Sequence, residues 1–261
     1  MSESAPHNLE NANGDPRILT DGPFDYVLAG SGSVLVGASQ GTLLEFPSSL
    51  GGQPVVATID GGIFFGANIP QVRLPNTLVS LGMGTFTNAN ISSLYIPASL
   101  VHMGRGALSF NTDLRYIEVD SDNYFFSMID DCLVEGGHTL RRFTCKEMDS
   151  TCIVPYGIIC LADHSFSGCD LASIEVSKSV SGIEASAFSY CTRLSSVKLP
   201  KGLKSIGDRA FGWCTSLTAI EIPESVTYMG RDVFYGCPSD LTLIVVEGSY
   251  AEHWAAENGL L

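Results

Sequence analysis

The sequence predicts a repeat solenoid, mostly β with short turns and a parallel sheet along one face, and three observations support this. A phenylalanine and a cysteine recur three residues apart in four units, and the cysteines are separated by 22, 23 and 23 residues. A two-step alternation of apolar residues follows each pair, which is typical of a short half-buried strand. Proline often ends these strands, because it cannot donate to a strand ladder. A period of this length indicates coils that stack on their neighbours.

The recurring residues define two columns that we expect to point into the solenoid. The aromatic column is predicted to contain Phe64, Phe86, Phe166, Phe188, Phe211 and Phe234, with Leu108 in the third unit. The second column contains Cys169, Cys191, Cys214 and Cys237, and the same position holds Ala67, Ala89 and Asn111 in earlier units. Because this position accepts Ala and Asn, we interpret its thiols as small buried groups. A third, apolar column is predicted five residues before each aromatic position, from Ile59 to Met229.

The unit is clearest in CTRLSSVKLPKGLKSIGDRAFGWC, from Cys191 to Cys214. Its Ile206-Gly207 and Ala210-Phe211 pairs and its closing cysteine resemble the leucine-rich repeats of the BspA-like bacterial surface proteins. The resemblance covers nearly the whole chain and implies a leucine-rich-repeat-like fold. It also implies adhesion to a host matrix protein, a cell-surface protein or a glycan, with no cofactor and no catalysis.

The repeat period divides the chain into six predicted regions. The 58 residues between Asn111 and Cys169 do not fit the period, and Gly136-Gly137 between apolar runs is a hairpin signal. Ser249 and Glu252 form a predicted capping box at the start of a final helix, and Gly259 terminates it. The regions are a disordered or loosely attached arm (1–22), an N-terminal cap with a hairpin around Gly30-Ser31-Gly32 and a partial repeat (23–58), repeats (59–119), an inserted β-hairpin (120–149), repeats (150–247) and a capping helix (248–261).

Charge and hydropathy narrow the possible partners. The formal net charge is -14, which argues against nucleic acid and anionic membranes as partners. No apolar run approaches the roughly 18 residues of a membrane span, so no membrane insertion is expected. The first twenty residues lack the basic and apolar parts of a signal peptide, which favours a cytoplasmic protein or a piece of an exported precursor. The resemblance instead favours a secreted or cell-surface location. A monomer is the favoured oligomeric state.

Motifs for catalysis or metal binding are weak. Cys160 and His164 are four residues apart, but they fall on a turn, and we interpret them as a thiol beside the ladder and a surface histidine. Cys132 and Cys145 are not expected to form a disulfide, because bridge geometry is narrow. An enzyme would need an acid, base or nucleophile set that no spacing here supplies.

Acidic residues gather around the predicted hairpin, at Asp120, Asp122, Asp130 and Asp131. We interpret them as solvating the hairpin and its loop. Calcium binding through two of their carboxylates is the alternative.

The outward face of the predicted strands is the candidate binding surface. If the two alternating apolar residues of each strand, such as Ile220 and Ile222, point inward, the intervening side chains must point outward. Seven strands about 4.8 Å apart would span roughly 30 Å, enough for a peptide, a loop or a short glycan. Tyr and Arg are enriched at interface hot spots, which favours the first half of this face. The candidate residues are Arg73, Tyr95, Tyr116, Glu118, Glu175, Lys198 and Glu221.

Two functions remain open at this stage. The first is a non-catalytic binding or adhesion module that uses the strand face. The second is a structural spacer or assembly domain of a larger envelope or cytoplasmic complex. Alternation of charge along Glu175, Lys198 and Glu221 also fits a simple cross-strand ladder without a ligand.

Overall fold

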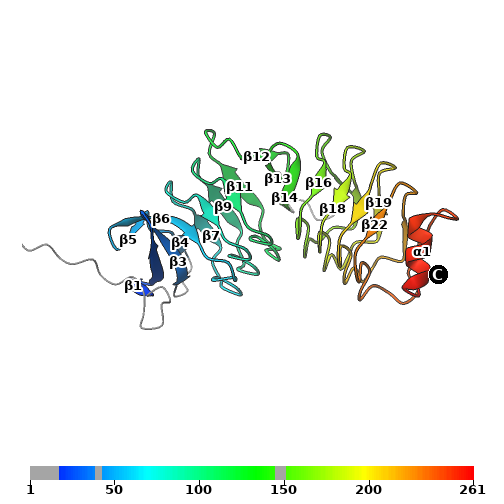
Figure 1. Cartoon of the computed structure of the whole chain (residues 1–261), viewed down its shortest axis with the longest axis horizontal. Coiled ribbons are helices and arrows are strands. Elements are labelled where there is room, and N and C mark those ends of the chain that lie inside the picture. The colour runs from blue at the N-terminus through cyan, green and yellow to red at the C-terminus, as the bar shows by residue number, and fades with distance from the viewer. Residues whose placement is uncertain (1–17, 39–42, 145–150) are drawn as a thin grey trace, which may run out of the picture.

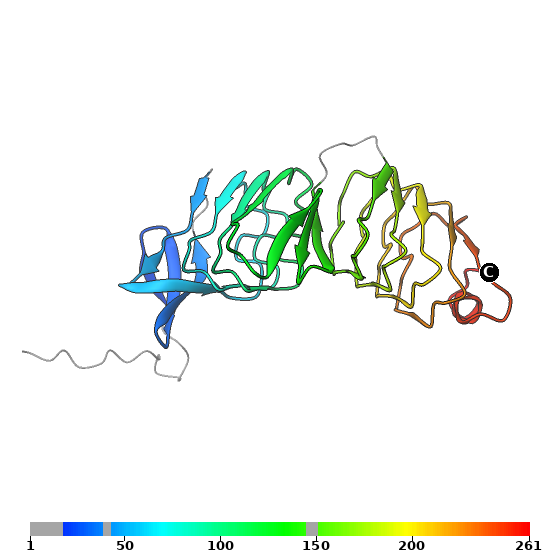
Figure 2. The ribbon, with the colours of Figure 1, turned by 90° about the horizontal axis from the view of Figure 1, so that it is seen from above.

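The protein is an elongated β-solenoid with one helix at its C-terminal end, which confirms the predicted fold class (Figure 1). The structure is a computed structural model that describes residues 18–38, 43–144 and 151–261. It contains two stacks of coils, which we call the first stack (residues 43–119) and the second stack (residues 151–245). Between them stands an insert of three antiparallel strands (residues 126–143), which we call the wedge (Figure 2).

The first stack carries two sheets. A seven-stranded sheet in the order β1-β2-β3-β6-β8-β10, with β5 paired to β6, contains the N-terminal cap and the short strands of the coils. The second sheet, in the order β11-β9-β7-β4, carries the predicted outward columns. The strands are β1 (Leu19–Asp21), β2 (Phe24–Ala29), β3 (Gly32–Ala38), β4 (Leu43–Glu45), β5 (Ser49–Leu50), β6 (Gln53–Thr58), β7 (Gln71–Arg73), β8 (Ser80–Leu81), β9 (Ser93–Ile96), β10 (His102–Met103) and β11 (Tyr116–Val119).

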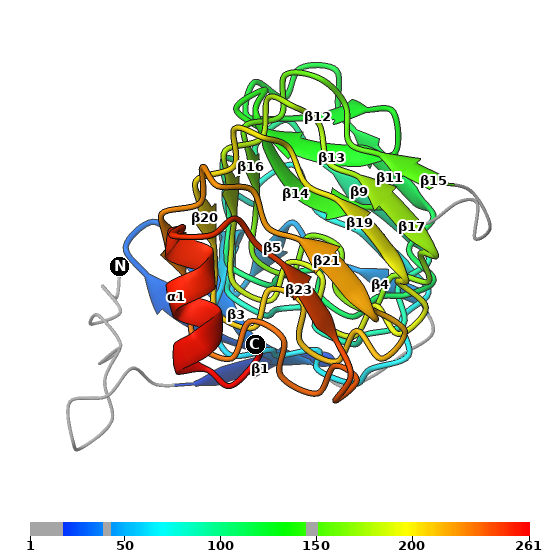
Figure 3. The same ribbon diagram turned by 90° about the vertical axis from the view of Figure 1, so that its right-hand side faces the viewer.

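The second stack repeats this plan and includes the wedge in its own sheet. That sheet runs β12-β13-β14-β16-β18-β20-β22, and the outward strands form sheets β15-β17-β19 and β21-β23. In the end-on view, β21 and β23 lie on one side of the coil and β16 and β20 on another (Figure 3). The elements are β12 (Phe126–Ile129), β13 (Cys132–Glu135), β14 (Thr139–Phe143), β15 (Thr151–Ile153), β16 (Cys160–Leu161), β17 (Ser173–Glu175), β18 (Gly182–Ile183), β19 (Ser196–Lys198), β20 (Ser205–Ile206), β21 (Ala219–Glu221), β22 (Tyr228–Met229), β23 (Thr242–Ile244) and α1 (Tyr250–Glu257).

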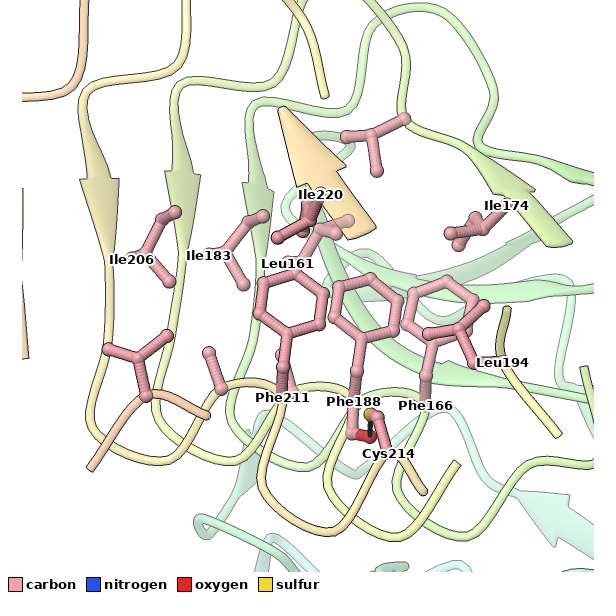
Figure 4. Packing of buried hydrophobic residues seen from close by; sticks show 14 of the residues in the cluster. Leu161, Phe166, Ile174, Ile183, Phe188, Leu194, Ile206, Phe211, Cys214 and Ile220 are labelled. Atoms are coloured by element: carbon pink, nitrogen blue, oxygen red, sulfur yellow. Dashed lines mark hydrogen bonds between the residues drawn. The ribbon is translucent and has the colours of Figure 1, made fainter. Parts of the chain in front are cut away.

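The aromatic column forms a continuous stack of rings inside the second stack (Figure 4). The ring centroids of Phe166 and Phe188 are 4.9 Å apart, and those of Phe188 and Phe211 are 5.1 Å apart. Each ring is buried, and the backbone N–H of Phe188 donates to the Ala210 carbonyl of the next coil at 2.8 Å, whereas that of Phe211 donates to the Val233 carbonyl at 3.0 Å. The Ala-Phe pair therefore combines a small residue that admits the next coil with a ring that fills the core.

The cysteine column supplies hydrogen-bond donors as well as small volume. Cys191 donates from Sγ to the Phe166 carbonyl at 3.1 Å, and Cys214 donates to the Phe188 carbonyl at 3.3 Å. Asn111 does the same in the first stack, because its Nδ2 donates to the Phe86 carbonyl at 2.7 Å. Size alone therefore does not explain why this position accepts both Cys and Asn.

The N-terminal region differs from the sequence prediction in two respects. Leu19–Asp21 pairs with β2, so the ordered cap starts before residue 23; the rest of the predicted arm, residues 1–17, lies outside the described residues. The third column begins at Thr58, not at Ile59, which is 38% exposed. The column is shifted because the Gly61-Gly62 turn adds one residue to this coil. Thr58 Oγ1 accepts from the Gly82 N–H at 2.7 Å.

Phe143 is a member of the aromatic column that the sequence prediction missed. Its ring stacks on Phe166 at 5.1 Å, and its N–H donates to the Ser165 carbonyl at 2.9 Å. Leu140 likewise pairs with Leu161 in the parallel register of β14 and β16. The wedge therefore ends as the first coil of the second stack.

The wedge joins the two hydrophobic cores through the alternation of a single strand. On β13, Leu133 packs in the core of the first stack, whereas Cys132 and Val134 pack in the core of the second. The register shifts between Leu133 and Val134, so that β14 carries one extra residue, Arg141, in a β-bulge. The inserted hairpin thus has apolar residues on both faces because both faces are covered.

Two arginines on β14 donate hydrogen bonds to backbone carbonyls at the end of the first stack. Arg142, 1% exposed, donates from Nη2 to the Asn111 carbonyl at 2.8 Å and from Nη1 to the Ser167 carbonyl at 3.1 Å. Arg141 donates from Nη2 to the Gly104 carbonyl at 3.1 Å. The two guanidinium groups replace hydrogen bonds that a further coil would make.

The contact between the wedge and the ends of the two stacks, which includes Phe110, Arg141, Arg142 and His164, is called the seam. His164 lies in it and is not the surface histidine that the sequence suggested. Its ring is 5.7 Å from that of Phe110, and a cavity of about 10 Å³ borders it, Arg142 and Asp163. The buried Nδ1 of His164 and Nε of Arg142 have no hydrogen-bond partner within the described protein. Burial lowers the pKa of His164, and the Arg142 and Arg105 charges add to this against the opposing Asp163.

Both ends of the aromatic columns are closed by another aromatic ring set edge-on. Phe46 packs against Phe64 at 5.6 Å, and Trp254 of α1 packs against Phe234 at 6.3 Å. The predicted capping box is present, because Ser249 Oγ accepts from the Glu252 N–H and Glu252 Oε2 accepts from the Gly248 N–H. The helix covers the last apolar coil, as a repeat array requires.

We expect Phe188→Ala to destabilise the protein by about 3 to 5 kcal/mol, because a buried ring between two stacked rings leaves a cavity. Urea denaturation followed by circular dichroism measures the change. Tyr124→Ala removes an aromatic side chain that is 93% exposed and should change the free energy of unfolding by less than about 0.5 kcal/mol. Equal effects of both substitutions would contradict the packing assignment.

We expect the native protein to protect Cys191 and Cys214 from a thiol reagent, because both are fully buried. Burial also raises the pKa of Cys214, which disfavours the reactive thiolate. Mass spectrometry after brief alkylation, with and without denaturant, identifies the labelled sites. Rapid labelling of either thiol in the folded protein would show that the column is accessible.

We expect stability to fall as the pH drops below about 6.5, in part because of His164. Burial lowers the pKa of this histidine in the folded protein, so the unfolded chain binds more protons as the pH falls. Unfolding by urea at about pH 7.5 and about pH 5.5 measures the effect. His164→Asn, which tolerates the left-handed φ of 56°, should reduce the pH dependence. His102→Asn, at an exposed histidine, should leave it unchanged; an unchanged slope in His164→Asn would refute the assignment.

Candidate functional site

The outward strand face is built from residues that alternate with the core residues of each strand. The described register places Arg73, Tyr95 and Glu118 side by side on β7, β9 and β11. Gln71, Ser93 and Tyr116 form the neighbouring column on the same strands. The inward alternates Val72 and Leu94 are buried, so the geometry of this face follows from the packing beneath it.

Tyr95 is the centre of a fixed polar cluster on this face. Its hydroxyl donates to Asp120 Oδ2 at 2.7 Å, and the Arg73 guanidinium carbon lies 4.0 Å from the centre of its ring. The bond to Asp120 raises the pKa of Tyr95 and lowers the pKa of Asp120. Tyr116 next to this cluster is 66% exposed. One tyrosine is therefore held in place and the other is open to solvent.

The strand face is not one continuous sheet of seven strands. Its strands fall into sheets of four, three and two strands. The wedge stands between β11 and β15, and a second break in hydrogen bonding lies between the neighbouring strands β19 and β21. The predicted site residues are therefore divided among three sheets.

In the second stack the predicted charges pair with each other. Lys198 Nζ lies 2.7 Å from Glu175 Oε1, with the two side chains 72% and 45% exposed. Glu221 lies opposite Ile244 on the separate β21-β23 sheet. The cross-strand charge ladder therefore describes Glu175 and Lys198.

Sequence reasoning missed two residues of this face, Thr151 and Ile153 of β15. Ile153 pairs with Glu175 in register and is 67% exposed, which adds an apolar side chain to the second column. The sequence did contain a signal for this strand, because Val154-Pro155 matches the end of other strands. The outward residues Ile153 and Thr151 lie two and four residues before this proline.

The acidic residues of the insert serve the local backbone. Asp120 Oδ1 accepts from the Asp122 N–H at 3.0 Å, and Asp130 has a φ of 50° in the turn between β12 and β13. Within the described ranges, no three His, Cys, Asp or Glu side chains gather as a metal site. Calcium binding by these carboxylates accordingly has no geometric support.

The thiols and histidines show no activated pair in the part of the chain that the structure describes. Cys160 Sγ donates to Glu184 Oε1 at 3.6 Å, and burial raises the pKa of its thiol to about 12. Burial likewise raises the pKa of Cys132 to about 12. Cys145, with which no disulfide is expected, lies outside the described residues. A nucleophilic cysteine needs a lowered pKa, so neither thiol is prepared for catalysis.

Within the residues that the structure describes, no helix is long and apolar enough to cross a bilayer.

Comparison with known proteins agrees with this geometry. The model for the BspA type leucine rich repeat region matches in six copies, over residues 49–147 and 142–252. Among solved structures, a leucine rich cell surface protein from Faecalibacterium prausnitzii has a TM-score of 0.59 at 18% identity, covering 94% of this chain and 98% of that one. The pneumococcal vaccine antigen PcpA has a TM-score of 0.49 at 16% identity, covering 88% of this chain and 81% of that one. A search of curated proteins finds no match.

The matched residues span most of the described solenoid and include its buried Phe, Ile and Leu columns. This is a repeat family of bacterial surface proteins whose members are non-enzymatic and typically bind other proteins. The chain belongs to the BspA-type leucine-rich repeat family.

Proposed function

We propose that the protein is a non-catalytic binding module that recognises a protein or a glycan with the strand face of its first stack. The binding patch consists of Arg73, Tyr95, Tyr116, Glu118 and Asp120. The observation that supports this most is the fixed Arg73, Tyr95 and Asp120 cluster beside an exposed Tyr116.

Preorganisation is the physical reason for choosing this patch. Immobilising a flexible side chain on binding costs about 0.5 to 1.5 kcal/mol, and the ring of Tyr95 is already held between Arg73 and Asp120. Tyr116 offers a large amphipathic ring with only two side-chain torsions. Glu118 is exposed beside it and adds a hydrogen-bond acceptor. A partner with donor groups and an apolar or CH-rich surface suits this combination.

The charges of the second stack contribute less in this proposal. An exposed pair such as Lys198 and Glu175 is worth about 0 to 1 kcal/mol, and a partner would have to separate it. Glu175, Lys198 and Glu221 therefore flank the site and steer approach, and the binding free energy comes from the first stack.

A cell-surface or secreted location is part of the proposal. The similar protein from F. prausnitzii is described as a cell surface protein, and multivalent adhesion at a surface is a use that suits a rigid repeat array.

Binding to an array of extracellular-matrix proteins and glycans tests the function. We expect at least one array member to bind. The double variant Tyr95→Ala/Tyr116→Ala should increase the dissociation constant for that ligand by about 30-fold or more, as for hot-spot residues. Tyr228→Ala is the control, because Tyr228 is 52% exposed on β22 and outside the strand face. Biolayer interferometry with each variant gives the constants.

Two outcomes would contradict the proposal. Unchanged binding by the double variant would move the site to the insert or to a loop edge. Failure of the folded protein to bind any array member or cell surface would favour the spacer or assembly function.

A further inference from the structure

We propose that the turn surface of the second stack is a self-association site whose partner is a second copy of this chain. The surface has two parts. The outer aromatic row comprises Tyr190, Trp213 and Tyr235, and the charge square comprises Asp208, Arg209, Arg231 and Asp232.

The aromatic row occupies a strained backbone position. In each coil the second residue after the aromatic-column position has a positive φ, and it is glycine at Gly66, Gly168 and Gly236. Tyr190 and Trp213 adopt φ values of 61° and 56° at the same position, as does Phe110 of the first stack at 57°, whereas Tyr235 lies one residue earlier in its coil. A bulky residue is an outlier in this region, with a conformational cost of about 1 to 3 kcal/mol. Because glycine would avoid this conformational cost, the aromatic side chains point to a role in binding.

The rings form a row from one coil to the next and are partly open to solvent. The Tyr190 and Trp213 rings stack at 4.7 Å with planes 11° apart, and Trp213 and Tyr235 meet edge to face at 4.7 Å. Tyr190 is 42% exposed and Tyr235 is 53% exposed. Trp213 lies over Gly236, whose position has no room for a larger side chain. The partly exposed rings suit packing against another aromatic row.

The charge square alternates in sign along both directions. Asp208 and Arg209 lie on one coil, and Arg231 and Asp232 occupy the same positions on the next. Arg209 pairs with Asp232 at 3.1 Å, and Arg231 pairs with Asp208 at 3.7 Å. Around them lies an open hollow of about 340 Å³.

This alternation makes the square complementary to itself. A two-fold axis in the plane of the surface, along the coils or across them, places each acidic corner opposite a basic corner of the second copy. Such an isologous contact is the commonest arrangement of soluble dimers. The net charge of -14 opposes association elsewhere, and the square has two charges of each sign. An anionic partner such as nucleic acid would meet no excess positive charge here.

Sedimentation velocity over about 1 to 500 µM protein tests this inference, since weak dimers fall in that range. We expect a dimer whose dissociation constant increases by about 100-fold in Arg231→Glu, because either axis then opposes two acidic groups. Lys201→Glu makes the same charge change at an exposed lysine outside the surface and should leave the constant unchanged.

A swapped square gives the decisive comparison. Asp208→Arg/Arg209→Asp/Arg231→Asp/Asp232→Arg keeps the alternation and should restore dimerisation to within about 10-fold of the original chain. A swapped variant as monomeric as Arg231→Glu would show that the square does not form the contact. A wild-type protein that stays monomeric throughout the range, or an Arg231→Glu variant that dimerises normally, would overturn the inference.

Discussion

The contact between equivalent residues of successive coils is the constraint on which the rest of this structure depends. A phenylalanine ring stacks on its counterpart about one coil away while its N–H donates to the next coil, so the core and the backbone share one spacing. Strands that hydrogen-bond lie about 4.8 Å apart, and the rings match that distance. Every other column, including the thiols, the short strands and the outward face, inherits its register from this contact.

The seam shows what happens where that contact is interrupted. The first stack ends on Leu108 instead of a ring, and the wedge restores packing with Leu133 on one face and Val134 on the other. Backbone carbonyls that a further coil would satisfy are taken by Arg141 and Arg142. A buried guanidinium is a demanding replacement, because its hydrogen bonds must offset its desolvation, and Nε of Arg142 has no partner within the described protein. The seam therefore brings charged side chains into the core, and burial there lowers the pKa of His164.

The strand side and the turn side of the coil differ in the backbone conformations that they require. Strand residues alternate strictly, so the outward side chains of β7, β9 and β11 form straight columns on which a rigid cluster can be assembled. The turn side contains two left-handed positions in each coil, a conformation that favours glycine, yet residues such as His164, Arg209 and Trp213 also occupy it. Binding by the strand face and self-association by the turn side would use different sides, so that a dimer could present two strand faces at once and gain avidity.

The period, the strand alternation, the hairpin at Gly136-Gly137 and the capping box of Ser249 could be predicted from the sequence, because each depends on residues close together or on an exact repeat. Phe143 also follows the 23-residue spacing to Phe166, but the non-repetitive residues around it obscured the pattern. The division of the strand face, the hydrogen bond from Tyr95 to Asp120 and the partial burial of His164 could be seen only in the folded protein. These depend on where a non-repetitive insert is placed between two stacks, and contacts between residues distant in the chain are not encoded in a local period.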